Sequence, residues 1–286
     1  MRPNSDRPAL TPDQYCQEKA AKSGSSFYYS FLFLPPEKRR AITALYAFCR
    51  EIDDVVDECS DPAVARAKLA WWREEIGKVF SGNPEHPVGR ALQSVASRHD
   101  LPVELFSEIM DGMEMDLDQA RYPDFKSLQL YCYRVASVVG LLSAEIFGFE
   151  NRKTLDYAHD LGIALQLTNI IRDVGEDARR NRIYLPMDEM AECGVTASDI
   201  LNSRPSENFD KLMAFQISRA KRYYEKAMHT LPDSDRQNQK PGLVMAAIYS
   251  ALLDEIARNP GSVLKCKTSL TPIRKIWIAW KTWRRG

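Results

Sequence analysis

Two stretches of the chain carry carboxylates at helical spacing inside otherwise apolar sequence. The first is ALYAFCREIDDVVDE, residues 44–58, and the second is LGIALQLTNIIRDVGED, residues 161–177. In each stretch the polar side chains recur every three or four positions, so on a helix they share one face. On the first stretch that face holds Tyr46, Arg50, Asp53, Asp54 and Asp57, and on the second it holds Gln166, Asn169, Asp173 and Asp177, with Arg172 beside it.

Such acidic stripes are costly unless a cation binds to them. Like charges one turn apart destabilise a helix by roughly 0.2–0.5 kcal/mol per pair, and burial adds a larger desolvation cost. One stripe alone would more often be a solvated acidic face, but two stripes, each with an arginine, favour a site where they meet across a cavity. Oxygen ligands select a hard cation, and Mg²⁺ fits best because it is usually held by carboxylates together with substrate phosphates. Arg50, Arg172 and Arg182 would then contact diphosphate oxygens.

The elements that position these stripes are helices. Most prolines precede runs of apolar residues spaced three and four apart, and proline at the first helical position loses no intrahelical hydrogen bond. The sequence has no sustained alternation of period two and no hairpin signal. We therefore predict an all-α bundle forming a single domain over residues 1–286. Helices are expected over 12–21, 36–59, 62–80, 87–99, 102–120, 124–148, 152–179, 205–231, 241–257 and 271–284.

Composition excludes several other classes of function. The 39 basic and 39 acidic residues balance, which argues against general attraction to nucleic acid. Neither GxGxxG nor GxxxxGK[ST] occurs, so a glycine-cradled nucleotide is not expected. The six cysteines lack CxxC spacing and the four histidines are scattered, which indicates reduced thiols and no zinc site. The polar N-terminus has no apolar signal segment, and the apolar stretch 135–149 is too short and too polar to span a bilayer, so we expect a cytoplasmic protein.

Several segments resemble the squalene/phytoene synthase family in sequence, order and spacing. They are DDVVDE at 53–58, GMEMDL at 112–117, YCYRVASVVG at 131–140 and LQLTNIIRDVGEDARRNRIYLP at 165–186. The resemblance extends over roughly residues 15–257. It implies an all-α isoprenoid-synthase fold around a central cavity, and an Mg²⁺-dependent prenyltransferase that joins two prenyl diphosphates head to head.

The resemblance also implies roles for individual residues. Asp53 and Asp57 would form the first metal-binding pair, and Asn169, Asp173 and Asp177 the second metal-binding set. The four aspartates, with Arg50 and Arg172, would be catalytic, and Val135, Val139 and Gly140 would line the prenyl channel, where the small Gly140 leaves room for the hydrocarbon. The full set expected to contact substrate is Ser23, Gly24, Ser25, Ser26, Phe27, Tyr46, Arg50, Tyr131, Val135, Val139, Gly140, Gln166, Arg172, Arg182, Tyr184 and Tyr249.

One segment departs from the family pattern. Many members open with a His-Ser-Lys/Arg-Ser-Phe motif, whereas this chain has SGSSF at 23–27, without the histidine or the cation. Hydroxyls and backbone N–H groups hold phosphate more weakly than charged donors do. The opening SGSSFYYSFLFLP most resembles bacterial presqualene diphosphate synthases of the hopanoid pathway. We therefore expect condensation of two farnesyl diphosphates to presqualene diphosphate, and no use of NADPH.

Three alternatives remain open at this point. The chain could be a phytoene synthase acting on geranylgeranyl diphosphate, or a complete squalene synthase that uses NADPH. It could also be an inactive family member that serves as an assembly protein. The intact set of acids and arginines argues against an inactive protein, because a costly charged stripe without a function should be lost first.

The C-terminal segment has a composition of its own. From Lys265 onward the chain contains seven Lys/Arg and no acid, with Trp277, Trp280 and Trp283 interleaved. Tryptophans on a basic helix suit a membrane interface, which would place a cytoplasmic protein on the inner face of the membrane. The same tryptophans could equally dock helix 271–284 on the bundle.

Overall fold

The computed structural model describes residues 10–22, 27–59 and 61–285, which form helices joined by short connections. No β-strand occurs within these ranges, where the strand-like pairing is limited to a single bridge between Arg121 and Ile183. The prediction of an all-α fold is confirmed. The expected phosphate-binding residues Ser23, Gly24, Ser25 and Ser26 lie outside the described residues.

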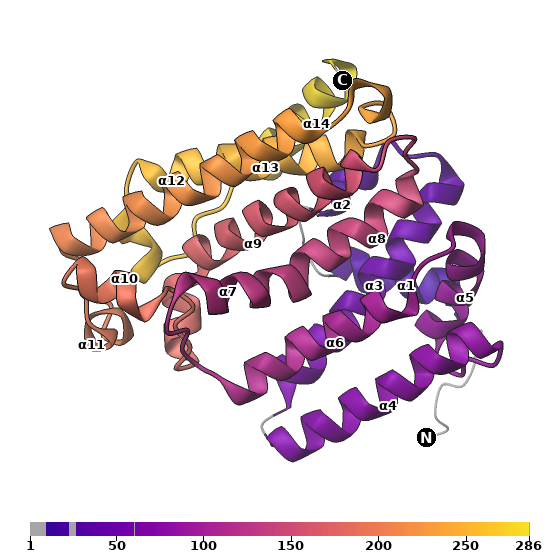
Figure 1. The fold of residues 1–286 in the computed structure, drawn as a ribbon, viewed down its shortest axis with the longest axis horizontal. Coiled ribbons are helices and arrows are strands. Elements are labelled where there is room, and N and C mark those ends of the chain that lie inside the picture. Colours follow the sequence, from indigo (N-terminus) through magenta and orange to yellow (C-terminus); the bar gives the residue numbers. More distant parts are fainter. Residues whose placement is uncertain (1–9, 23–26, 60, 286) are drawn as a thin grey trace, which may run out of the picture.

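The N-terminal helices pack around one hydrophobic cluster. Phe48 lies at its centre and makes edge-on contacts with Trp72 and Phe106, which come from two other helices. Such contacts add to the stabilisation that burial of the rings provides. Figure 1 shows most of these helices in indigo and purple at the lower right. The elements are α1 (Pro12–Lys22), α2 (Phe27–Phe31), α3 (Pro36–Glu58), α4 (Pro62–Ser81), α5 (Pro87–His99) and α6 (Val103–Asp118).

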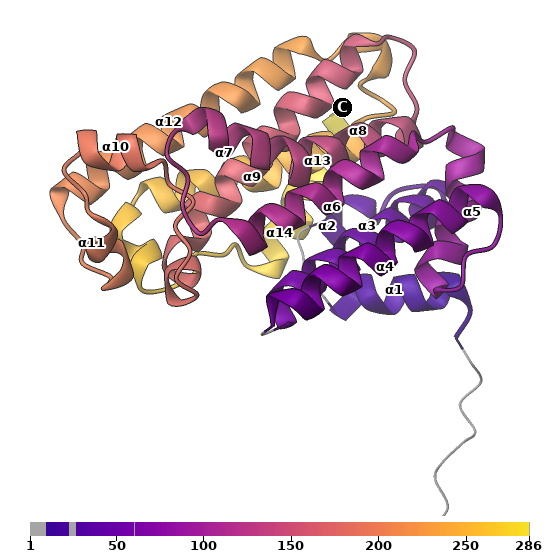
Figure 2. The same ribbon diagram turned by 60° about the horizontal axis from the view of Figure 1, so that its bottom comes forward.

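The C-terminal helices surround a second cluster. The long α9 (Lys153–Arg179) is its axis, because α12 and α13 both pack along it, as Figures 1 and 2 show from two directions. Ile163, Leu167 and Ile171 of α9 are buried there. The other elements are α7 (Phe125–Cys132), α8 (Val138–Phe147), α10 (Met187–Glu192), α11 (Ala197–Leu201), α12 (Glu207–Thr230), α13 (Lys240–Ala257), α14 (Pro272–Arg285) and the 3₁₀ turns Asp233–Asp235 and Pro260–Leu264.

A π-helical segment, Tyr133–Ser137, joins α7 to α8 and is held between two glycines. A Cβ on Gly162 of α9 would lie 2.5 Å from the Ser137 Cα, and one on Gly112 of α6 would lie 2.8 Å from the Val135 Cγ1. Both helices can therefore pack against the segment only because these positions lack side chains. A single π turn shifts the helical register, and such turns are frequent at functional sites.

By length and composition, the continuous helical run Phe125–Phe147 could cross a bilayer. In this fold Leu128 and Leu142 are buried in the two hydrophobic clusters. Val135 and Val139 face an internal cavity instead. Burial and the cavity therefore account for part of the apolar sequence of this run, of which 44% of the most apolar window is buried, while Leu130 is exposed.

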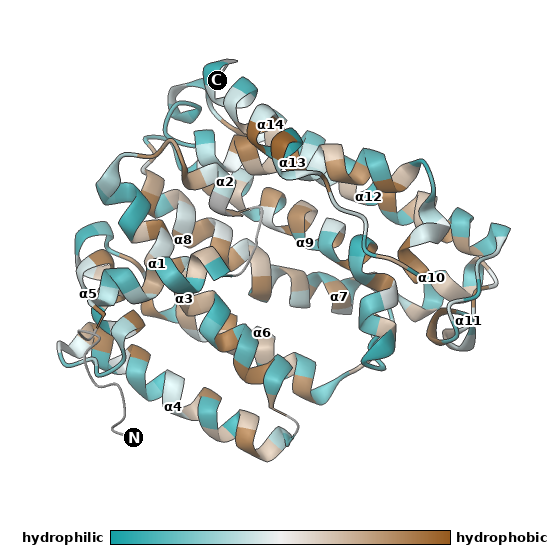
Figure 3. Ribbon diagram, turned by 180° about the vertical axis from the view of Figure 1, so that it is seen from behind, coloured by the Kyte–Doolittle hydropathy of each residue, from teal (hydrophilic) through white to brown (hydrophobic). Residues whose placement is uncertain are grey.

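The long helices follow the predicted ranges closely, and Asp61 acts as the side-chain N-cap of α4. Thr196 and Asp199 form a complete capping box. Apolar and polar segments alternate along most helices in Figure 3, in keeping with the three-and-four spacing that predicted them. The sequence analysis missed α2, α10 and α11, which are six residues or shorter.

Candidate active site

A cavity of about 750 Å³ is lined by residues from both halves of the bundle. Along α9 its lining is apolar over residues 157–165 and becomes polar over residues 166–177. At a rise of 1.5 Å per residue these positions extend over roughly 30 Å of helix. The cavity thus has a charged end and an apolar end, and the charged end is lined by six acids and six bases: Asp53, Asp57, Asp116, Asp173, Glu176, Asp177, Arg50, Arg172, Arg180, Arg182, Lys267 and Lys275.

The first carboxylate group lies on the last turns of α3. Arg50 donates to Asp53 at 2.5 Å and to Asp54 at 2.6 Å, so one guanidinium spans the two acids. Lys19 of α1 pairs with Asp54 from the other side at 2.8 Å. Burial raises the pKa of Asp53 to about 6. The negative charge of Asp57 raises this pKa further, whereas the positive charge of Arg50 lowers it. Without a bound cation, this end of α3 therefore carries an unfavourably buried negative charge.

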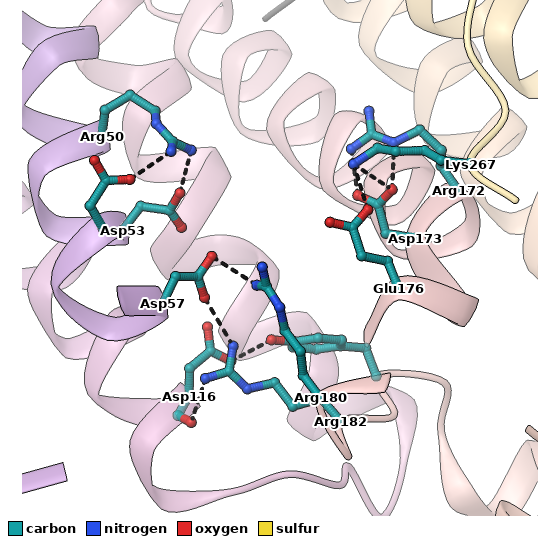
Figure 4. Close-up of polar contacts among 12 residues, drawn as sticks. Arg50, Asp53, Asp57, Asp116, Arg172, Asp173, Glu176, Arg180, Arg182 and Lys267 are labelled. Atoms are coloured by element: carbon teal, nitrogen blue, oxygen red, sulfur yellow. Dashed lines mark hydrogen bonds and ion pairs between the residues drawn. The ribbon is translucent and has the colours of Figure 1, made fainter. Parts of the chain in front are cut away.

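The second group lies on α9, across the cavity from the first. The Arg172 Nε donates to the Asp173 Oδ1 at 2.8 Å. Lys267, from the segment before α14, lies 3.2 Å from Asp173 and 2.9 Å from Glu176. Asp177 has its pKa raised to about 7 by burial and by the like charges of Asp173 and Glu176. Figure 4 shows this group and the α3 group on opposite walls.

The chain reversal after α9 brings further charged groups into the site. Asn181 adopts a left-handed conformation (φ 59°), which asparagine tolerates better than most residues. Ile183 then pairs with Arg121 as an isolated parallel bridge. This path turns Arg182 and Tyr184 back toward the cavity, where both contribute to the lining.

Asp57 links the α3 wall to this returning segment. Arg180 donates to its Oδ2 at 3.0 Å and Arg182 to its Oδ1 at 3.3 Å, as drawn in Figure 4. Two cations on one carboxylate leave net positive charge at this point of the cavity mouth. An anion with several oxygens could therefore bind beside Asp57, particularly if the carboxylate also held a metal ion.

Asp116 of α6 is a further enclosed acid of the charged end. Tyr184 donates to one of its oxygens at 2.7 Å and Tyr131 donates to the other at 2.9 Å. Burial nevertheless raises the pKa of Asp116, and this effect outweighs the two hydroxyls and the nearby Arg182. Tyr131 therefore supports an acid at the cavity wall as well as lining the cavity itself.

A buried amide oxygen on α9 lies among the candidate Mg²⁺ ligands. The Oδ1 atom of Asn169 is buried and has no hydrogen-bond partner, while its amide nitrogen donates to Gln166 at 3.3 Å. A buried oxygen without a donor suits a cation. Across residues 10–22, 27–59 and 61–285, no three His, Cys, Asp or Glu side chains gather closely enough to hold a metal by themselves. The residues therefore fit Mg²⁺ when phosphate oxygens of a substrate complete its coordination.

The apolar end is built from α2, the π segment, α8 and α13. Phe27 stacks on Tyr46 with ring centroids 5.6 Å apart, which places an aromatic wall next to the α3 carboxylates. Val135 and Val139 also line the cavity. Gly140 lines the cavity too, and packing also requires glycine there, since a Cβ would lie 2.6 Å from the carbonyl oxygen of Ala158.

Every predicted site residue that the structure describes lines this one cavity, from Phe27 to Tyr249. Their individual roles remain predictions. The cavity is also lined by Glu176, Arg180, Lys267 and Lys275, which were not predicted from the sequence. Glu176 and Arg180 lie within the specific 165–186 segment, which could have indicated them. The sequence around the two lysines does not indicate a role in this site, because only the tertiary fold brings them close to α9.

The chain is similar in sequence to known enzymes. The family model for squalene/phytoene synthase matches residues 20–275. A chloroplastic phytoene synthase of Narcissus pseudonarcissus is 38% identical over 87% of this chain, which spans 61% of that longer protein. A phytoene synthase of Arthrospira platensis is 36% identical over 94% of this chain and 92% of its own length.

Solved structures give the same assignment. A dehydrosqualene synthase crystallised with a ligand superimposes with a TM-score of 0.84 at 28% identity, and the match covers 96% of both chains. A squalene synthase from Alicyclobacillus acidocaldarius superimposes with a TM-score of 0.79 at 26% identity, covering 87% of this chain and 94% of the other. The chain therefore belongs to the squalene/phytoene synthase family of prenyltransferases.

Proposed function

We propose that this protein condenses two molecules of farnesyl diphosphate into presqualene diphosphate and releases one diphosphate, as a step toward squalene and hopanoids. The observation that carries the proposal is the single cavity with carboxylates and cations at one end and an apolar chamber at the other. That polarity matches an amphipathic substrate whose diphosphate must leave while its hydrocarbon stays away from water.

The residues of the charged end would bind and activate the diphosphates. Asp53 and Asp57 on one wall, and Asn169, Asp173 and Asp177 on the other, would hold Mg²⁺. Bound Mg²⁺ would neutralise charge on the leaving diphosphate. The guanidinium groups of Arg50, Arg172 and Arg182 would donate to diphosphate oxygens and stabilise the charge that develops there as the carbon–oxygen bond breaks.

The apolar end would shelter the carbocation. When the C1–O bond of one farnesyl diphosphate breaks, diphosphate leaves with the electron pair and an allylic cation remains. Phe27 and Tyr46 present stacked rings near the charged end, and such rings attract a cation by ~0.5–2 kcal/mol. The double bond of the second substrate attacks this cation, a proton is lost, and a cyclopropane closes with the second diphosphate retained.

Three groups could accept the proton in this reaction. The released diphosphate is one, and Tyr46 and Tyr249, which both line the cavity, are the others. Burial raises the pKa of Tyr249 against the opposing effect of the neighbouring Arg172. Its hydroxyl would therefore stay protonated at neutral pH, which favours a role as hydrogen-bond donor over that of base and leaves the diphosphate and Tyr46 as candidate acceptors.

A second candidate is phytoene synthesis from two geranylgeranyl diphosphates, which the identity to the Narcissus and Arthrospira proteins favours. The SGSSF opening supports the farnesyl substrate instead, through its resemblance to presqualene diphosphate synthases. A complete, NADPH-dependent squalene synthase and an inactive assembly protein are the remaining alternatives.

Competition between the two substrates tests the proposal. Purified protein would receive equal concentrations of farnesyl and geranylgeranyl diphosphate with Mg²⁺, with and without NADPH, and the products would be separated by chain length. We expect presqualene diphosphate as the main product under both conditions. A predominance of prephytoene diphosphate or phytoene would establish the second candidate, and the absence of any product would contradict both.

A further inference from the structure

Helix α14 has two apolar faces, and the bundle covers only one of them. Ile278 and Ala279 are buried, and Trp283 packs on the ring of Phe33 with centroids 5.4 Å apart. The Nζ atom of Lys240, on α13, also lies over the Trp283 ring, 5.7 Å from its centroid. Through this inward face the helix packs on its neighbours α13 and α2.

The outward face is apolar as well, and it is exposed. Ile273 is 81% exposed, Trp277 54%, and both Ile276 and Trp280 47%. These four residues follow the spacing of three, four and seven that defines one stripe of a helix. Figure 3 shows apolar and strongly polar segments side by side on α14. An exposed stripe of this kind is unnecessary for docking and marks a surface for interaction.

Basic side chains border the exposed stripe. Lys281 lies 4.6 Å from the centroid of the Trp277 ring, and Arg284 lies 5.2 Å from that of Trp280. From Lys265 to the end, the sequence contains seven Lys/Arg and no acid, although the chain as a whole is neutral. Trp277 and Trp280 thus lie beside basic side chains in a segment that is locally basic, although Arg274 at its start pairs with Glu255 of α13 at 2.8 Å.

We propose that the outward face of α14 binds the surface of an anionic lipid bilayer, with the helix lying in the plane of the interface. Charge complementarity selects this partner, because a basic rim around isoleucine and tryptophan matches anionic headgroups above acyl chains. Tryptophan rings accumulate at that boundary, where one edge is apolar and the other is hydrated.

The position of α14 connects this surface to the cavity. Lys275, on the inner side of the same helix, and residues 267–270 just before it line the cavity wall. A helix with its side chains is about 10 Å across, so membrane contact would bring that wall within roughly this distance of the lipid. On the proposed function, the product could then pass its hydrocarbon chains to the bilayer with little exposure to water while its diphosphate stays among the headgroups.

Vesicle co-sedimentation tests the proposal on the full-length protein. Phosphatidylcholine vesicles with and without phosphatidylglycerol would be compared for the wild type, for Trp277→Ser/Trp280→Ser and for Lys281→Ala/Arg284→Ala. The matched control is Trp71→Ser, which removes another exposed tryptophan, 40% accessible, from α4. Circular dichroism and turnover in detergent solution would show that each variant is folded.

We expect the wild type and the Trp71→Ser variant to bind the anionic vesicles alike, and to bind the neutral vesicles weakly. Each double variant should bind the anionic vesicles on the order of 10-fold more weakly. Wild-type protein that does not sediment with anionic vesicles would overturn the proposal, as would double variants that bind as the wild type does. A wild-type dimer in solution that the tryptophan double variant abolishes would show that a second copy of the chain, not lipid, covers this face.

Discussion

Replacing Asp177 by asparagine should stabilise the protein in the absence of metal while abolishing its activity. The folded protein holds the pKa of Asp177 at about 7, against 3.8 for an ordinary aspartate. At about 1.4 kcal/mol for each factor of ten in acidity, ionised Asp177 at pH 8 would cost the folded state roughly 4 kcal/mol. Because solvent screens the charge of a partly exposed side chain, we expect Asp177→Asn to raise the free energy of unfolding by only about 2 kcal/mol.

The pH dependence of this gain follows from the direction of the pKa change. Near pH 4 the folded carboxyl is already protonated and uncharged, so Asp177→Asn should change little. Between pH 4 and 7 the wild type loses stability relative to the variant, because its unfolded state ionises first. Above pH 7 the difference in unfolding free energy between the variant and the wild type should be constant. For a chain of 286 residues this difference in unfolding free energy corresponds to an increase in Tm of about 3 °C.

Thermal unfolding in EDTA, followed by circular dichroism from pH 4 to pH 8, measures the effect. Glu225→Gln is the matched control, because it removes an exposed carboxylate from α12 and should leave Tm unchanged at every pH. Mg²⁺ with inorganic diphosphate should stabilise the wild type more than Asp177→Asn. The reasoning is refuted if Asp177→Asn lowers Tm at pH 8, or if its effect is the same at pH 4 and pH 8.

Two further predictions concern the metal ligands and the packing around the π segment. Asp53→Asn and Asp173→Asn should each reduce turnover at least ~100-fold with an unchanged circular dichroism spectrum, since each removes a ligand without changing volume; activity within a few-fold of wild type would show that the metal binds elsewhere. Gly162→Ala should cost about 1–3 kcal/mol of unfolding free energy in denaturant titrations, because its Cβ would meet the Ser137 backbone. Gly77→Ala on α4, where a Cβ meets nothing within 4 Å, should instead be neutral or stabilising by up to ~1 kcal/mol, and equal losses for the two alanines would contradict the packing argument.

The acidic stripes could be predicted from the sequence because helical periodicity is a local property. Asp53 and Asp57 lie one turn apart on α3, and Asp173 and Asp177 lie one turn apart on α9, so their shared faces follow from spacing alone. Spacing alone does not say that the two faces meet across a cavity. We predicted this from the rule that a buried charge needs a partner, and in the fold the aspartates of both helices do line one cavity.

The groups that could not be predicted depend on tertiary structure or on hydrogen-bond register. Lys267 reaches Asp173 across 94 positions of sequence, because the segment after α13 runs back along α9. The π turn at Tyr133–Ser137 differs from an α-helix only in its hydrogen-bond register, which residue type does not reveal. Periodicity also left the orientation of α14 open, and the fold divides its tryptophans by turning Trp283 inward and Trp277 and Trp280 outward.

The stoichiometry of a reaction on labelled farnesyl diphosphate tests the central claim most directly. Purified protein with Mg²⁺ and excess NADPH would be sampled for released diphosphate, remaining substrate and lipid products. Because the SGSSF opening lacks the cation found in many relatives, we expect the second diphosphate to be retained. The account predicts one diphosphate released for every two farnesyl diphosphates consumed, with presqualene diphosphate accumulating. Release of two diphosphates with formation of squalene, or release of diphosphate with only farnesol as product, would contradict it.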